Sequence, residues 1–273
     1  MFISQFCGVH LTITFVWICK RVTGRLSTIR CVENIRYSTV SIDGKHSVLQ
    51  QRSTVQLLHV AHRYNIPISS LLFNESFNTT DNETIILNNG IQLTNLPQLQ
   101  KMHVVNKDDC NTSEITEQDV VNILLCAMKD QHFNSLCFEG CRLPVSFSSS
   151  SFTNVMISRA IKVSWCPFDS VFHLDLQTGL WEVDDTQVLE NIRSSTVSID
   201  CSVLQQRSTV QLLHVAHRHN IPISGLYLKE SFSKIDAGNV ILHSGLRLSC
   251  PVSVEKVVID TRRRREMTRD RGC

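Results

Sequence analysis

Thirty residues of this chain occur twice with little change. The stretch from Val48 to Phe77 returns from Val203 to Phe232, and only five of the thirty positions differ. Val203 lies 155 positions after Val48, whereas solenoid repeats have periods of about 20 to 50 residues. The repeat therefore predicts the duplication of one domain, or of a domain fragment, within a chain of 273 residues.

The repeated stretch has the pattern of two consecutive helices. Ser53 and Gln56 have the spacing of a capping box, in which the serine oxygen accepts a backbone N–H and the glutamine reaches back. Apolar residues then recur at helical spacing as far as Asn65, which tolerates a left-handed stop. Pro67 suits the first turn of a second helix, over 68 to about 77. We therefore expect a helix pair in each copy.

The pattern predicts an α+β chain of two such modules with short strands or hairpins. Ahead of a serine-rich stretch, Thr116 and Asp119 can begin a further helix that extends the first copy. The expected parts are an apolar segment at 1–30, a first repeat with its extension at 31–143, a linker at 144–152, a second repeat at 153–260 and a basic tail at 261–273.

The amino-terminal segment has two interpretations. From Phe2 to Cys19 it contains no charged residue, and that length just reaches a membrane span. It lacks the basic start and the small-residue cleavage site of a signal peptide. Because polar residues dilute the run and β-branched residues crowd its centre, a buried strand is favoured over a membrane span.

The net charge of +2 is unevenly distributed. The tail from 261 to 273 holds six arginines and two acidic residues, so it contributes +4 and the remainder sums to −2. The body of the chain therefore lacks the basic surface expected of a nucleic-acid-binding protein. Within the tail, a run of four arginines is a candidate nuclear-import signal: Arg262, Arg263, Arg264 and Arg265.

The sequence predicts no catalytic residue, cofactor or metal site. It has no glycine-rich phosphate loop, dinucleotide fingerprint, nucleophile elbow or paired-histidine zinc motif. The acidic pair Asp184 and Asp185 is more typical of a helix start or a solvated turn. The eleven cysteines are scattered, and the closest two, Cys137 and Cys141, lack the spacing and the second pair of a zinc site. We therefore expect a non-enzymatic protein with reduced thiols.

The repeated stretch resembles part of a known interaction domain. LLHVAHRYNIPISSLLFNESF is similar to the last helix pair of a BTB/POZ domain, where an L-L-x-x-A-x-K-Y-x-I-x-x-L pattern leads into a second helix. The run QQRSTVQLLHVAHRYNIP of the first copy, taken together with ESFSKIDAGNVI of the second copy, is most similar to plant-type BTB proteins with a BACK-like helical extension. The resemblance covers roughly 35 to 45 residues in each copy, and the front half of the domain precedes neither copy.

The resemblance implies a function in protein binding. BTB/POZ domains dimerise and dock a cullin scaffold, so the chain is expected to be a substrate adaptor or scaffold in cullin-type ubiquitin ligation, located in the cytoplasm or the nucleus. In such domains a tyrosine at the position of Tyr64 lies near the cullin-facing surface. The residues expected to bind a partner are Tyr64, His62 and Arg63 in the first copy and His217, Arg218 and His219 in the second.

Two predictions, a helix and a hairpin, are possible for each of the segments 84–96 and 239–250. The resemblance predicts helices there. Their Asn-Gly and Ser-Gly turns, which lie between apolar residues, are typical of hairpins, and the hairpin is favoured.

Two other functions compete with the adaptor. The first is a secreted or membrane-anchored glycoprotein, with acceptor triplets at Asn74, Asn78, Asn82 and Asn111. The second copy lacks counterparts of the first three triplets, which favours a chance origin. The second alternative is a truncated, duplicated family member without the parent activity.

Overall fold

The computed structural model describes residues 35–260 with short gaps, so the predicted apolar segment and the arginines of the basic tail lie outside the described residues. The described chain divides into unit 1, up to Val104 with Asn122–Asn134, and unit 2, which holds Val105–Val121 and the chain from Ser135 onward. The gaps are 45, 75–76, 82–83, 88–89, 95, 107–113, 129–130, 157–159, 168–170, 184–185, 200–202, 230–231, 237–238, 243–246 and 250–253.

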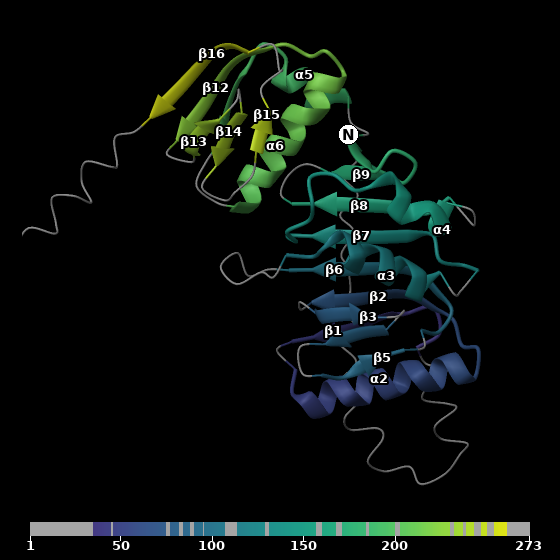
Figure 1. Cartoon of the computed structure of the whole chain (residues 1–273). Helices are drawn as coiled ribbons and strands as arrows, with labels where there is room; N and C mark the ends of the chain where they lie inside the picture. The colour runs from purple at the N-terminus through teal and green to yellow at the C-terminus, as the bar shows by residue number, and fades with distance from the viewer. Residues whose placement is uncertain are drawn as a thin grey trace, which may run out of the picture. The chain divides into compact units, whose positions relative to one another are not determined.

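Unit 1 contains the first copy of the repeat as a strand–helix–strand module (Figure 1). Strand β2 pairs in parallel with β1 on one side and with β6 on the other. An antiparallel meander, β3–β4–β5, is inserted between β2 and β6. The elements are β1 (Thr39–Asp43), α2 (Val48–Arg63), β2 (Ile68–Asn74), β3 (Phe77–Asp81), β4 (Thr84–Leu87), β5 (Gln92–Leu93) and β6 (Leu99–Val105).

Unit 2 contains a middle region before the second copy. Strands β7 and β8 pair in parallel, whereas β8, β9 and β10 form an antiparallel run. Helix α3 is divided between the two units. The elements are α3 (Glu117–Ala127), β7 (Ser135–Glu139), the 3-10 turn η3 (Ser149–Phe152), α4 (Thr153–Met156), β8 (Lys162–Cys166), β9 (Phe172–Asp175), β10 (Leu180–Val183) and α5 (Thr186–Ile192).

The second copy repeats the module of the first, element for element. Strand β12 lies between β11 and β16 in parallel pairing, and an antiparallel meander is again inserted before the last strand. The elements are β11 (Thr196–Ile199), α6 (Val203–Arg218), β12 (Ile223–Lys229), β13 (Phe232–Asp236), β14 (Asn239–Leu242), β15 (Arg247–Ser249) and β16 (Val254–Asp260).

The two copies also share the turn that precedes β1 and β11. In the first, Tyr37 has φ +59° and its N–H donates to the carbonyl of Pro67 over 2.9 Å. In the second, Ser194 has φ +56° and its N–H donates to Pro222 over the same distance. The duplication seen in the sequence is therefore a duplication of structure.

The prediction of a second helix in each copy is wrong. Residues 68–74 form β2, a strand whose backbone bonds to a neighbour on either side and whose Ile68, Leu71 and Phe73 are buried. Ile68 and Leu71 are three residues apart, which imitates a helical stripe. Pairing with a strand on each side satisfies backbone N–H and C=O groups of this buried segment, and that outweighs its local preference.

The predicted capping box also shifts by six residues. Helix α2 begins at Val48, and its box is made by Ser47 and Gln50. The Ser53 hydroxyl instead donates to the carbonyl of Leu49 inside the helix, over 2.8 Å. The predicted left-handed stop at Asn65 is confirmed, since its φ is +52°.

Other local predictions are confirmed. The segments 84–96 and 239–250 contain the antiparallel strand pairs β4·β5 and β14·β15, so the hairpin prediction is confirmed over the helix prediction. Thr116 and Asp119 exchange the two hydrogen bonds that begin α3. The chain is of mixed helix and strand, as expected, but it also contains parallel strand pairs, and α2 and α6 each connect two such parallel strands, which the sequence interpretation did not predict.

The predicted serine-rich linker is packed within unit 2. Phe147 and Phe152 of this segment are buried, and their rings lie 5.4 Å apart. A flexible tether would leave such side chains in water, so the segment contributes to the core of unit 2.

Candidate protein-binding surfaces

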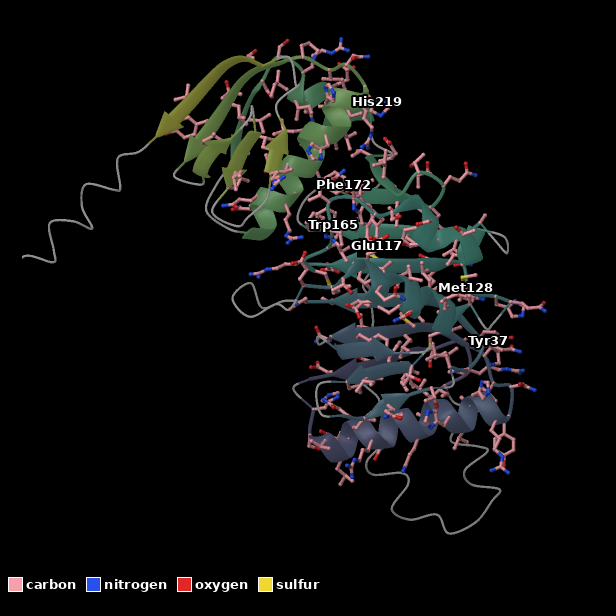
Figure 2. All side chains as sticks on the ribbon, in the orientation of Figure 1. Tyr37, Glu117, Met128, Trp165, Phe172 and His219 are labelled. Carbon is pink, nitrogen blue, oxygen red and sulfur yellow. The ribbon has the colours of Figure 1, made fainter. Side chains whose placement is uncertain are left out.

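An aromatic cluster fixes the position of β10 in unit 2. Trp181 is fully buried, and its ring lies 5.6 Å from that of Phe147 and 5.4 Å from that of Trp165. Its indole N–H donates to the carbonyl of Pro144 over 3.0 Å. Figure 2 labels Trp165 and Phe172 on neighbouring strands of the same cluster. Because the Trp181 ring is packed on several sides, the carbonyl of Trp181 and the neighbouring side chain of Glu182 have little freedom to move.

The carboxyl end of α6 is held by β10. Arg218 donates to one oxygen of Glu182 over 3.0 Å and also to the backbone carbonyl of Trp181. Nε2 of His219, labelled in Figure 2, lies 3.1 Å from the other oxygen of Glu182. The Glu182 carboxylate therefore binds two consecutive side chains of the repeat. Because these groups are partly exposed, the pairs orient the helix more than they stabilise it.

The amino-terminal half of α6 is held by a buried arginine. Arg207 is only 8% exposed, and it donates to the carbonyl of Leu143 over 2.6 Å and to Glu114 over 2.9 Å. Between the two arginines, Gln211 and Val215 are buried as well. This face of α6 is therefore covered from Arg207 to the pairing of Arg218 with Glu182.

Helix α2 has the same sixteen residues as α6, but the corresponding face is open. Arg52, Gln56 and Arg63 are exposed, and Val60 is half-buried. Arg52 and Arg63 are eleven residues apart, close to three helical turns, so they lie on one face about 16 Å apart. The helix contains no acidic residue. The first copy thus presents a cationic helix face whose duplicate is covered in the second copy.

One histidine of each helix has a lowered pKa. Burial lowers the pKa of His214, and the charges of Arg218 and His217 add to the effect. Burial, followed by the nearby His62, likewise lowers the pKa of His59. At neutral pH these two histidines therefore add little positive charge to that of the arginines.

The residues expected to bind a partner divide between the two copies. Arg218 and His219 are engaged by Glu182 within the chain. In the first copy Tyr64 is 46% exposed and Arg63 is exposed, while Nδ1 of His62 lies 2.7 Å from the carbonyl of Leu96. His217 is exposed in the second copy.

Sequence reasoning missed Arg52 and Arg207, and it missed Glu114 and Glu182, the carboxylates that bind Arg207 and Arg218. The signal that could have revealed them was the identical sequence of the two helices, because identical residues can differ in exposure and contacts only through the segments that surround them. Of the candidate glycosylation sites, Asn74 donates to Asp43 over 2.9 Å; the other three have side chains outside the described residues.

A row of polar side chains crosses the sheet of unit 2. Cys137, Ser164, His173 and Glu182 are successive neighbours on β7, β8, β9 and β10. The Ser164 oxygen lies 3.1 Å from Nδ1 of His173. Ser164 is nearly buried, so this contact satisfies two polar groups inside the sheet.

Within the described part of the chain, no group of three or more histidine, cysteine or acidic side chains is placed to hold a metal ion. No helix among those residues is long and apolar enough to cross a membrane. Comparisons with protein-family models, curated proteins and solved structures found no match.

Proposed function

We propose that the chain is a non-enzymatic protein–protein interaction protein, an adaptor or scaffold that receives a partner polypeptide on the open face of α2. One observation carries the proposal. Sixteen identical residues form two helices, and the face that is covered on α6 is open on α2. A helix face that binds protein in one copy has the chemistry to bind protein in the other.

The coverage of α6 defines the chemistry of that partner. Each of the two arginines of α6, Arg207 and Arg218, donates to one carboxylate and to one backbone carbonyl. A partner for α2 would offer the same pair of groups to Arg52 and to Arg63, about 16 Å apart. Between them it would offer a small apolar surface to Val60. Acidic groups on the partner complement the net positive charge of the helix.

The BTB/POZ resemblance supplies a specific candidate, a cullin scaffold. The resemblance depends on α2 and on residues 68–77, of which 68–74 form a strand. Tyr64, which the resemblance places near the cullin-facing surface, lies at the end of the open face. We propose the cullin scaffold as the partner and ubiquitin ligation as the pathway, with the chain acting in the cytoplasm or nucleus.

The proposal is tested with a purified cullin scaffold and the immobilised full chain. We compare the wild-type chain, Tyr64→Ala and the double variant Arg52→Glu/Arg63→Glu. All of these positions are exposed, so the variants should fold. Loss of both arginine contacts should weaken binding at least about tenfold, which corresponds to about 1.4 kcal/mol.

Lys101→Glu serves as the control, because Lys101 is an exposed cation on β6, away from α2 in sequence. It should bind like the wild type. If the full chain recovers no cullin, the adaptor proposal is refuted. If the double variant binds as well as the wild type, cullin binding stands and the α2 face is excluded as its site.

A further inference from the structure

Two cysteines of unit 2 lie side by side on neighbouring parallel strands. Cys137 on β7 is opposite Ser164, and Cys166 on β8 is opposite Glu139, so the two share one face of the sheet. Their sulfur atoms are 4.0 Å apart. Both side chains are half-buried and accessible to a small reagent. The alternate residues Leu136, Phe138, Val163 and Trp165 point into the core.

The pair is electrostatically asymmetric. Hydrogen bonding from Cys137 lowers the pKa of Cys166 to about 7, against the opposing effects of burial and of Glu139. The same shared hydrogen bond, together with burial, raises the pKa of Cys137. Either sulfur can donate in this pair, and the lowered pKa of Cys166 favours Cys137 as the donor and Cys166 as the thiolate.

Two other cysteines provide an internal contrast. Cys126 and Cys141 are each 1% exposed, and burial raises the pKa of Cys141 to about 12. Buried thiols that stay protonated are inert towards disulfides and alkylating reagents. Reactivity in this region should therefore be confined to Cys166.

We propose that Cys166 is a thiol–disulfide exchange site for small disulfides of the glutathione class, with Cys137 as the hydrogen-bond donor that positions and sustains its thiolate. The Cys166 sulfur attacks one sulfur of oxidised glutathione. The disulfide bond of the reagent breaks, a bond forms between Cys166 and the attacked sulfur, and one glutathione thiolate leaves and takes a proton from water. The exchange involves no net oxidation or reduction, since one thiolate and one disulfide are replaced by another thiolate and another disulfide.

The modification would change the polar face of the sheet. Glutathione is a bulky anionic tripeptide, and Cys166 lies two residues from Ser164 in the polar row. Exchange at this site would therefore add negative charge and volume beside the row, and reduction would remove them. This inference does not depend on the proposed binding face of α2.

The test treats the full chain with oxidised glutathione and follows each cysteine by peptide mapping with mass spectrometry. The expected result is a glutathione adduct on Cys166, with Cys126 and Cys141 unmodified. A Cys137–Cys166 disulfide also supports the proposal if Cys137→Ala then accumulates the adduct on Cys166. Initial modification at Cys137, or reaction of Cys166 no faster than that of Cys126, overturns it.

The donor role of Cys137 has its own test in the pH dependence of the exchange rate. The midpoint for Cys166 should lie near pH 7 and rise towards about 8.5 in Cys137→Ala. At pH 7 the exchange should slow by only about threefold, because roughly fifteenfold less thiolate is offset by about fivefold greater nucleophilicity. Cys137→Ser retains a donor and should keep the low midpoint. A midpoint unchanged in Cys137→Ala refutes the donor role.

Discussion

Arg207 and Arg52 occupy the same position of two helices with one sequence, which makes them a matched pair for substitution. Arg207 is buried and donates to the Leu143 carbonyl and to Glu114, whereas Arg52 is exposed. Arg207→Ala leaves the buried Leu143 carbonyl without this donor and removes the cation from a half-exposed carboxylate. Arg52→Ala removes no contact of this kind.

The cost follows from the hydrogen bonds that are lost. A buried acceptor left unsatisfied costs about 1–3 kcal/mol, and a hydrogen bond to a charged group contributes about 1.5–3 kcal/mol. Nε of Arg207 is itself buried with no hydrogen-bond partner among the described residues, so its removal offsets part of the loss. We expect Arg207→Ala to destabilise the chain by about 2 kcal/mol, and Arg52→Ala to change its stability by less than about 0.5 kcal/mol.

Urea denaturation of the full chain, followed by tryptophan fluorescence, measures this difference. Trp165 and Trp181 lie in the same unit as Arg207, so their emission reports on the affected region. In thermal unfolding the same loss should lower the midpoint by roughly 4–8 °C. Equal losses in the two variants, or a loss below about 0.5 kcal/mol for Arg207→Ala, would refute the reasoning.

Two further predictions use the same measurement. Gly179 has φ +71° and a Cβ there would lie 2.3 Å from the carbonyl oxygen of Phe147, so Gly179→Ala should cost more than about 2 kcal/mol. Gly90→Ala, at φ +78° with no atom within 4 Å of the new Cβ, should cost only about 1 kcal/mol; equal costs would contradict the clash. Burial and Arg218 lower the pKa of His214, so near pH 6 the unfolded chain binds more protons than the folded one. Stability should therefore fall as the pH drops through 6.5, and His214→Gln should lose less over that step; an unchanged pH profile in this variant would count against the assignment.

Features set by a few consecutive residues were predictable from the sequence. The Asn65 stop, the cap at Thr116 and the hairpin turns depend on backbone conformations and side-chain reach within about four residues. Their outcome changes little with the surroundings. The helix of each copy was likewise predicted, although the cap of α2 lies six residues before the expected one.

The strand β2 was not predictable in the same way. Its sequence, ISSLLFN, carries apolar residues at spacings that suit either a short helix or a strand. The choice depends on β1 and β6, which bond to its two sides although both lie more than twenty residues away along the chain. Pairing over such a separation leaves no trace in the local pattern.

The candidate site depended on tertiary structure even more strongly. The sequence VLQQRSTVQLLHVAHR occurs twice and forms a helix both times, and its apolar stripe faces the sheet in both copies. It does not state that Arg207 is covered and Arg52 is open. That difference arises because Glu114, Leu143 and β10 lie against α6, so a carboxylate and a carbonyl meet each of its arginines. Local propensity fixed the helix, and contacts between distant segments decided which of its faces remains available.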